Sequence, residues 1–458
     1  MDNKNSVIKL SLFAITWPIF IESALQMFLR TADTFMLSKV SDSAVAAVGV
    51  ANQIIMFTFL LFNFVAVGSA VVITQYLGAQ KRDEIGKLAA TSISLNLLFG
   101  VLISLVMIFF CNPILHMFDL DPSLFSLAKS YLLIAGGSLF IQAVMITITA
   151  IIQSHGFTKY TMFVALGINA IHIVGNYLFI YGALGVPKLG VVGVAISTVI
   201  SICIGLFINL LVLTKKVHVK IIWKNLFSWN KDHVKKILKI GIPASASNLS
   251  YSANQIVTTA FIVSLGSEML STRIYTQNIM FFIMILAISL GRGVQIIIGH
   301  LVGAGEKEEA YKQAFLNLRR SMIITLTAVL IICLFRNQLL SLFTDDSDII
   351  SLGSVLLLMG FLLEPGRNFN IFLERSLQAA GDARFSMFVS IFVIWCFSVP
   401  LTYLLGIHLG YGLIGMWVAF IADEWVRGLI LCLRWKSRTW ENKALIKHEN
   451  KGTKAVIS

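Results

Sequence analysis

Charged residues are scarce in this chain, since Asp, Glu, Lys and Arg make up only 13% of its 458 residues. An ordinary soluble domain carries roughly a quarter charged residues and about half apolar ones. Here hydrophobic residues reach 57% and the mean hydropathy is +0.83. These values exclude a soluble globular protein and predict an all-α integral membrane protein.

Cysteine is also sparse, and catalytic signatures are missing. The five cysteines (Cys111, Cys203, Cys333, Cys396 and Cys432) show no C-x-x-C spacing, so neither a metal centre nor a disulfide framework is expected. The H-E-x-x-H, G-x-S-x-G and phosphate-loop patterns are absent as well. The sequence therefore predicts no enzyme and no cofactor, and an intramembrane enzyme or a channel remains only a distant alternative.

Apolar segments long enough to cross a bilayer recur along the whole chain. A membrane-spanning helix needs about 20 residues to cross roughly 30 Å of hydrocarbon. Twelve such spans are predicted near residues 9–36, 45–74, 88–111, 126–152, 160–182, 190–214, 236–265, 275–302, 318–340, 350–378, 385–406 and 412–434. The first is too long for a cleavable signal peptide and lacks a small-residue cleavage site, so we expect it to be a span.

The second half of the chain repeats the first half at an offset of 225 residues. Matching pairs are Pro18 and Pro243, Gly68 and Gly293, Gly78 and Gly303, Asn112 and Asn337, Gln153 and Gln378, and Gly156 and Gly381. A repeat this long exceeds solenoid periods of roughly 20–50 residues. It predicts two pseudo-symmetric six-helix lobes, and two lobes around a central site favour transport by alternating access.

Four regions follow from this pattern. We expect an N-terminal lobe over residues 1–214, a linker over 215–239, a C-terminal lobe over 240–434 and a basic tail over 435–458. The linker mixes lysines with apolar residues around Trp223, which is typical of a helix lying on the membrane surface. In the tail, Trp435 and Trp440 are expected at headgroup depth, with a mobile end beyond them.

The net charge of +13 arises mainly from loops on one side of the predicted topology. Lysine and arginine resist translocation, and they collect after spans 2, 6 and 8, on the side of both termini. Both termini are therefore predicted to be cytoplasmic in a multi-pass protein of the plasma membrane. The same distribution explains the charge without a nucleic-acid partner, so the expected partners are the lipid bilayer and small molecules.

Span 1 carries the densest set of polar residues. Glu22, Gln26, Arg30 and Asp33 fall within one stripe at 100° per residue. Charged groups inside a membrane are costly and are functional candidates by default. The stripe has no copy in the second half, so we predict ion coupling at Asp33 and Glu22. The alternative is a neutralised Arg30–Asp33 pair that only supports helix packing.

Spans 5 and 6 add polar residues that could complete this site. His172 and Asn176 lie one turn apart, Asn169 lies one turn before them, and Thr198 stands in span 6. Oxygen atoms of these side chains could complete a sodium site at Asp33 and Asn176. Alternatively, the side chains could hydrogen-bond to a protonated Asp33 carboxyl. A packed, hydrogen-bonded histidine without any ion-binding role is the alternative for His172.

A central substrate cavity is predicted between the lobes. Its candidate residues are Gln26, Arg30, Asn52, Gln277, Glu364, Arg367 and Asn370. For the group in span 10, a purely structural Glu364–Arg367 ion pair remains an alternative. Weaker candidates are Arg292 in span 8 and Asp423, Glu424 and Arg427 near the end of span 12. Without a functional role, these side chains are expected to extend to the membrane surface.

The chain resembles the MATE family of multidrug and toxic-compound extrusion antiporters over nearly its whole length. The resembling stretches are WPIFIESALQMFLRTADTFMLSKVSDSAVAAVGVANQI, GSAVVITQYLGAQKRDEIGK, GVQIIIGHLVGAGEKEEAYKQA, SLQAAGDARF and LGYGLIGMWVAF. The resemblance implies a V-shaped pair of six-helix lobes. It also implies export of amphipathic, often cationic organic compounds in exchange for inward protons or sodium.

Several residues match the family's functional positions. Asp33 matches the aspartate of span 1, His172 and Asn176 the polar pair of span 5, and Thr198 the threonine of span 6. Tyr251 stands where the NorM-type branch has an acidic residue, and His172 replaces an oxygen donor. These departures favour coupling in the first lobe, as in the DinF-like branch, and protons over sodium. We expect a monomer, with a lipid-linked precursor flippase as the alternative function.

Overall fold

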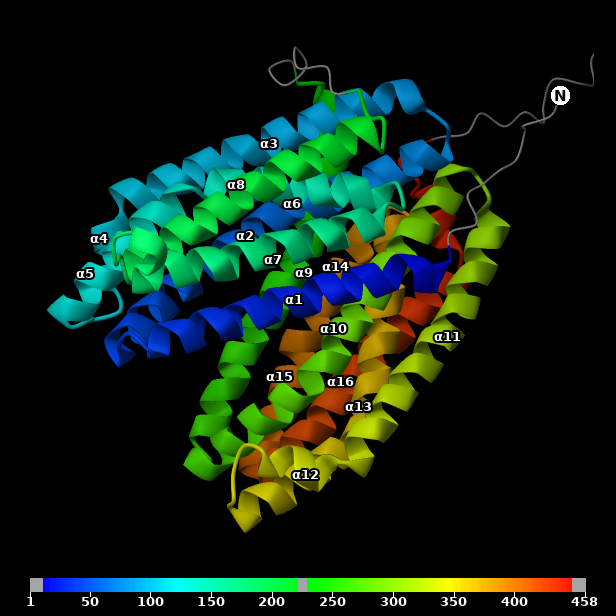
Figure 1. Ribbon diagram of the computed structural model, residues 1–458. Coiled ribbons are helices and arrows are strands. Elements are labelled where there is room, and N and C mark those ends of the chain that lie inside the picture. Colours follow the sequence, from blue (N-terminus) through cyan, green and yellow to red (C-terminus); the bar gives the residue numbers. More distant parts are fainter. Residues whose placement is uncertain (1–10, 221–228, 447–458) are drawn as a thin grey trace, which may run out of the picture.

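The computed structural model describes residues 11–220 and 229–446, and this part of the chain is helical, with no strand (Figure 1). Its long segments are α1 (Leu12–Ser38), α2 (Asp42–Gly78), α3 (Arg82–Phe109), α5–η1–α6 (Pro122–Tyr131, Leu132–Gly136 and Leu139–Ser154), α7 (Thr158–Tyr181), α8 (Val191–Lys215), α9 (Lys231–Val263), α10 (Ser267–Gly303), α11 (Lys307–Leu334), α13 (Ser347–Ala379), α14–η4–α15–η5 (Ala383–Val393, Ile394–Ser398, Val399–Tyr403 and Leu404–His408) and α16 (Gly412–Lys436). Short helices are α4 (Cys111–His116), α12 (Arg336–Ser341), η2 (Ala183–Gly185) and η6 (Thr439–Asn442). The predicted all-α membrane fold of twelve spans in two lobes is confirmed.

Nine of the described helices are long and apolar enough by themselves to cross a membrane. The α5–η1–α6 segment, bent by 46°, makes a tenth. Helices α9 and α16 complete the twelve; lysines in the first turns of α9, and acidic and basic residues in the middle of α16, lower their apolar content. The predicted span 318–340 is displaced, because α11 begins at Lys307 with a charged first turn and ends at Leu334.

The duplication is visible in the helix boundaries themselves. Adding 225 to the bounds of α2, α3 and α4 gives the bounds of α10, α11 and α12. The bent segment Pro122–Ser154 corresponds in the same way to α13. The first lobe, α1 to α8, and the second lobe, α9 to α16, are therefore two copies of one helical unit.

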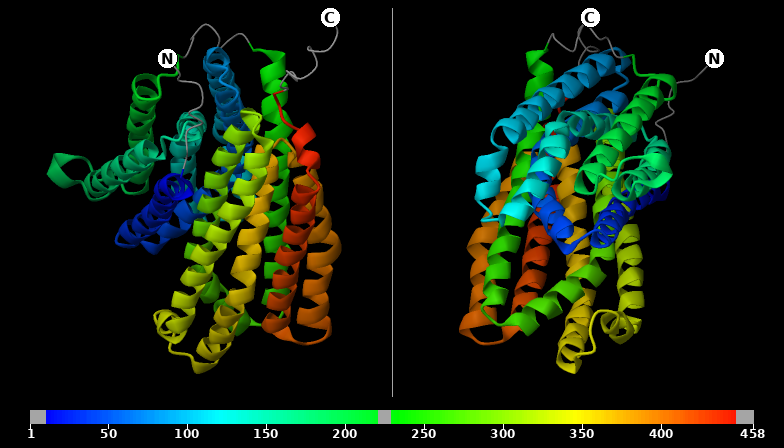
Figure 2. Two further views of the ribbon diagram at one scale, coloured as in Figure 1. Left: turned by 90° about the vertical axis from the view of Figure 1, so that its right-hand side faces the viewer. Right: turned by 60° about the vertical axis from the view of Figure 1, so that its left-hand side comes forward.

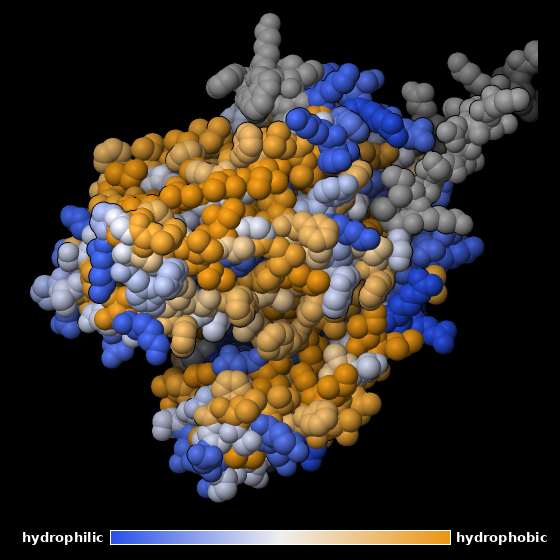
Figure 3. All heavy atoms as spheres, viewed as in Figure 1, coloured by the Kyte–Doolittle hydropathy of each residue, from blue (hydrophilic) through white to orange (hydrophobic). Residues whose placement is uncertain are grey.

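The two lobes meet at one end of the molecule and diverge toward the other (Figures 1 and 2). We call the meeting end the closed face; it contains the last turns of α2, α6, α10 and α13. The opposite end is the open face, where the space-filling view shows a hollow between the lobes (Figure 3). Orange, apolar side chains cover much of the flanks seen in this view, as expected for surface that contacts lipid.

Backbones of the two lobes touch directly at the closed face. A Cβ atom on Gly78 would lie 2.0 Å from the carbonyl oxygen of His300, and one on Gly303 would lie 2.0 Å from that of Gln75. No real Cβ tolerates such a distance, so the approach of α2 to α10 requires glycine. The four residues form two pairs related by the repeat, which makes the contact pseudo-symmetric.

Two side chains reinforce this contact in the same symmetric way. Gln75 Nε2 donates to the carbonyl oxygen of Ala379 at 2.7 Å, and His300 Nε2 donates to that of Ser154 at 2.8 Å. Each bond crosses from one lobe to the last turn of a helix in the other, where carbonyl groups lack helical partners. The closed face is thus hydrogen-bonded as well as closely packed.

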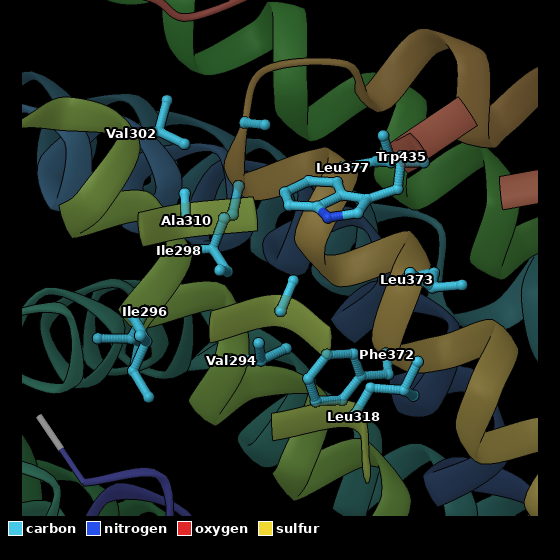
Figure 4. Packing of buried hydrophobic residues seen from close by; sticks show 14 of the residues in the cluster. Val294, Ile296, Ile298, Val302, Ala310, Leu318, Phe372, Leu373, Leu377 and Trp435 are labelled. Carbon is cyan, nitrogen blue, oxygen red and sulfur yellow. The ribbon is translucent and has the colours of Figure 1, made fainter. Parts of the chain in front are cut away.

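A large hydrophobic cluster fills the second lobe behind this contact. Val294, Ile298, Phe372, Leu377 and Trp435 are at most 2% exposed and bring α10, α13 and α16 together (Figure 4). Burying such side chains contributes about 1.5–3 kcal/mol each relative to exposure in water. The cluster packs the helices of the second lobe together, and it also includes Leu12, Ile15 and Ile19 of α1.

The predicted interfacial position of Trp435 and Trp440 is wrong. Both rings are 0% exposed and stack on each other with centroids 4.2 Å apart. The two indoles stack face to face, and the Trp440 Nε1 finds its partner in the Trp435 carbonyl oxygen, so neither ring needs the headgroup region. The predicted surface helix around Trp223 and the end of the tail lie outside the described residues.

Candidate functional site

Asp33 on α1 faces two polar side chains of α7. Its Oδ1 accepts hydrogen bonds from His172 Nε2 at 2.8 Å and from Asn176 Nδ2 at 2.6 Å. His172 and Asn176 lie one turn apart, so a single face of α7 presents both donors. The Asp33 side chain is 15% exposed, whereas that of His172 is 2% exposed. One carboxylate oxygen is therefore engaged inside the lobe, and Oδ2 has no hydrogen-bond partner among the described residues.

The far side of the His172 ring is held by α8. Ser197 Oγ donates to the His172 carbonyl oxygen at 2.9 Å, and Ser201 Oγ lies 3.4 Å from His172 Nδ1. Ser201 can also donate to the carbonyl oxygen of Thr198 at 2.9 Å. A hydroxyl has one proton, so donation to Thr198 leaves its oxygen able to accept from a protonated imidazole. Both ring nitrogens of His172 therefore face a polar side chain, Asp33 on α1 and Ser201 on α8.

Tyr131 on α5 belongs to this site, although the sequence reasoning missed it. Its Oη donates to Asn52 Oδ1 at 3.2 Å, lies beside Thr198 and is within electrostatic range of Asp33. Thr198 Oγ1 donates to the Val194 carbonyl oxygen of its own helix at 2.8 Å, and among the described residues it forms no hydrogen bond with Asp33. A tyrosine within an apolar span could have indicated this residue, because a buried tyrosine hydroxyl needs a hydrogen-bond partner.

Glu22 lies on the stripe predicted from the sequence but forms a separate site. Its Oε2 accepts from Gln153 Nε2 at 3.0 Å and from Thr161 Oγ1 at 2.8 Å. Eleven residues of helix place it about 16 Å from Asp33 along α1. Arg292 of the second lobe is within electrostatic range of Glu22. The stripe therefore contains two carboxylates in two different environments.

Gln26 and Arg30 lie between these carboxylates and are exposed. Within the described chain neither side chain has a hydrogen-bond or ion-pair partner, so the alternative Arg30–Asp33 pair does not form in this conformation. Gln277 on α10 is likewise exposed. Asn52 is exposed apart from its bond to Tyr131. These four predicted cavity residues are available to solvent or to a ligand.

The predicted cavity residues of α13 are instead part of a buried ion network. Arg367 Nη1 donates to Glu364 Oε1 at 2.5 Å and its Nε lies 3.5 Å from Glu424 Oε1. Asn370 Nδ2 donates to Glu424 Oε2 at 2.8 Å. Glu364 and Asn370 are 0% and 2% exposed. Arg367 and Asn370 connect α13 to Glu424 of α16, and Glu364 and Asn370 are not accessible to a substrate in this conformation.

The charged residues of α16 also belong to this network. Arg427 pairs with Asp423 and, at 3.2 Å, with Glu424 Oε2. All three are 4% exposed, so the expectation that they extend to the membrane surface is wrong. Arg427 pairs with both carboxylates on its own helix, and Arg367 of α13 also pairs with Glu424. Because these opposite charges lie close together, the side chains can stay buried without extending to water.

Two homologous six-helix lobes, with a partly exposed carboxylate on α1 of the first lobe, are the arrangement of a membrane transporter. The chain belongs to the MatE family, whose model matches residues 18–178 in the first lobe and 243–404 in the second. It is therefore a multi-pass membrane transporter and not an enzyme.

Individual relatives cover nearly the whole chain. The uncharacterized transporter YisQ of Bacillus subtilis is 44% identical over 95% of this chain and 96% of that protein. The probable multidrug resistance protein NorM of Thermotoga maritima is 26% identical, with coverage of 96% and 95%. A solved multidrug resistance MATE family transporter in an outward-facing conformation has a TM-score of 0.86 at 21% identity, with coverage of 95% and 98%. The last comparison shows the shared fold.

Proposed function

We propose that this protein is an antiporter that exports amphipathic, often cationic organic compounds and is driven by inward proton movement through Asp33. The observation that carries the proposal is the divided environment of this carboxylate. Its Oδ1 is held by His172 and Asn176, while Oδ2 is free of protein partners and the side chain is partly exposed. Relatives named as multidrug resistance proteins support the substrate class.

The geometry suggests a simple exchange at this carboxylate. Ionised Asp33 attracts a cationic substrate through Oδ2 while the buried donors hold Oδ1 in place. A proton that binds the Asp33–His172 pair removes the net negative charge and weakens that attraction, so the substrate leaves. Release of the proton on the cytoplasmic side restores the negative charge of Asp33. One carboxylate therefore couples proton entry to substrate release.

The donor set favours protons over sodium. Both groups that contact Asp33 Oδ1 are nitrogens that carry hydrogen, and such donors repel a metal cation. Sodium binding between Asp33 and Asn176 would require the Asn176 amide to turn so that Oδ1 faces the carboxylate. Proton binding requires no such rearrangement, and the His172 imidazole beside Asp33 is a second group that can carry a proton.

Orientation follows from the basic loops. Lys81 and Lys307 stand beside the closed face, in loops that the positive-inside rule assigns to the cytoplasm. With cytoplasmic termini and a plasma-membrane location, the conformation described here is open to the outside. Rocking of the lobes 1–214 and 240–434 about the linker 215–239 would open the other side. We propose this cycle for a single chain.

A second candidate is a flippase for lipid-linked anionic precursors. Arg30 and Arg292 are exposed and, within the described residues, have no ion-pair partner. Unpaired guanidinium groups suit a phosphate. Uptake of a fluorescent lipid phosphate from the outer leaflet, measured by dithionite quenching, distinguishes this activity from dye export.

Purified protein in liposomes tests the main proposal under separately imposed proton and sodium gradients. We expect ethidium movement to follow the proton gradient alone and Asp33→Asn to abolish it, because the amide cannot exchange a proton. Asp119→Asn, the same change at an exposed carboxylate in the loop after α4, is the control and should retain gradient-driven movement. Movement that follows sodium, or that persists in Asp33→Asn, would contradict proton coupling through Asp33.

A further inference from the structure

The described chain continues past α16 as a strap, which we define as residues 437–446. Its first part is anchored on the second lobe. Trp440 stacks on Trp435, and its Nε1 donates to the Trp435 carbonyl oxygen at 3.0 Å. Arg438 Nη2 donates to Glu308 Oε2 at 2.9 Å and its guanidinium lies over the ring of Tyr311. The fully buried stacked pair supplies most of this anchorage, since exposed ion pairs contribute little.

The last described residues of the strap lie on the other lobe. Ile446 is 5% exposed and belongs to a hydrophobic cluster of the first lobe with Val72, Leu88 and Ile152. Leu445 packs against the same cluster, which also contains Ile237 of α9, and against Ile240 and Ala383 of the second lobe. The strap therefore crosses from the second lobe to the first at the closed face.

Gln75 joins the strap to the inter-lobe contact. Its Oε1 accepts from the backbone N–H of Leu445 at 2.8 Å, while its Nε2 donates to the carbonyl oxygen of Ala379 at 2.7 Å. The side chain is 0% exposed, so both ends of one buried amide are used. An unpaired amide at such a position would be costly. Separating the lobes here breaks both bonds together.

We propose that the strap is a built-in latch that stabilises the conformation closed at this face. Opening this face requires Leu445 and Ile446 to leave the first lobe, because the stacked tryptophans hold the other end on the second lobe. Release exposes the apolar side chains of both residues and the Gln75 amide, and each of these costs favours the closed conformation. The latch rests on the lobe rocking of the proposed function.

The test measures the conformation directly. Nitroxide labels at Leu184→Cys and Asp345→Cys, exposed positions on the open-face ends of the two lobes, report the separation of the lobes by pulsed electron paramagnetic resonance. The background has the five native cysteines replaced. The altered strap carries Leu445→Asp and Ile446→Asp. A chain ending at Ile446 is the control.

In the control we expect the two labels to stay far apart, as in the conformation with the open face open. In the variant with the altered strap we expect a second population with a shorter distance between the labels. The ratio of the long-distance population to the short-distance population should fall at least tenfold, which corresponds to about 1.4 kcal/mol. A chain ending at Ala444 lacks both residues and adds no charge. If the Leu445→Asp, Ile446→Asp variant does not fold, this shorter chain should show the same fall in the ratio. Distance distributions in the folded variant identical to the control would overturn the latch. Because no substrate or gradient is used, this result stands apart from the outcome of the transport assay.

Discussion

Replacing Gly78 with alanine should push the two lobes apart at the closed face. The added Cβ would meet three backbone atoms of α10, namely the carbonyl oxygen of His300 at 2.0 Å, its carbonyl carbon at 2.9 Å and the nitrogen of Ala304 at 2.8 Å. Backbone atoms cannot rotate away as a flexible side chain can. Since ordinary contacts lie near 3.5 Å, α2 and α10 must separate by on the order of 1 Å or more.

The energetic consequence can be bounded. Overpacking of a well-packed site costs typically about 1–3 kcal/mol, and a factor of ten in an equilibrium corresponds to about 1.4 kcal/mol. If the cost falls only on the closed conformation, its population relative to the alternative should drop by roughly 5-fold to 150-fold. The gain in helix propensity from alanine, up to about 1 kcal/mol, is common to both conformations and cancels.

Gly49 provides a matched control on the same helix. A Cβ at Gly49 would have no neighbouring atom within 4 Å, so Gly49→Ala changes helix propensity without changing the inter-lobe contact. The assay is the distance between labels on the open-face ends of the lobes, measured for both variants. A Gly78→Ala protein that is folded and has the same distance distribution as Gly49→Ala would refute the reasoning.

Three further predictions concern the first-lobe site, the second-lobe network and the topology. His172→Gln keeps a side-chain donor to Asp33 but removes the imidazole that could carry an added proton, so proton-driven efflux should fall well below the wild-type rate; an unchanged rate would contradict it. Arg427→Leu leaves the buried Asp423 carboxylate without its partner, while Glu424 keeps Arg367 and Asn370, and it should destabilise the second lobe by about 3–5 kcal/mol. Thermal-shift measurements should show this loss, with little change in the control Arg384→Leu at an exposed position. In the cysteine-free background, Ser347→Cys should react with an impermeant thiol reagent on intact cells and Lys216→Cys should not; the reverse pattern would invert the orientation.

The local features of this fold could be predicted from the sequence. Apolar runs predicted the twelve spans, mostly within a few residues, because the thickness of a bilayer sets a minimum helix length. The fixed offset predicted two lobes, because a duplicated sequence reproduces the same helix boundaries. The helical period also predicted that Asp33 and Glu22 share one face of span 1. Each of these properties depends on residues close together in the chain.

Only the tertiary structure decided which residues meet across the chain. Tyr131 lies beside Thr198, and the Glu22 carboxylate pairs with Gln153 and Thr161, although periodicity says only which face a residue occupies. The position of Trp440 was mistaken for the same reason. Whether an aromatic ring lies at the membrane surface or against another ring depends on how the helices pack, and packing joins residues that are far apart in sequence.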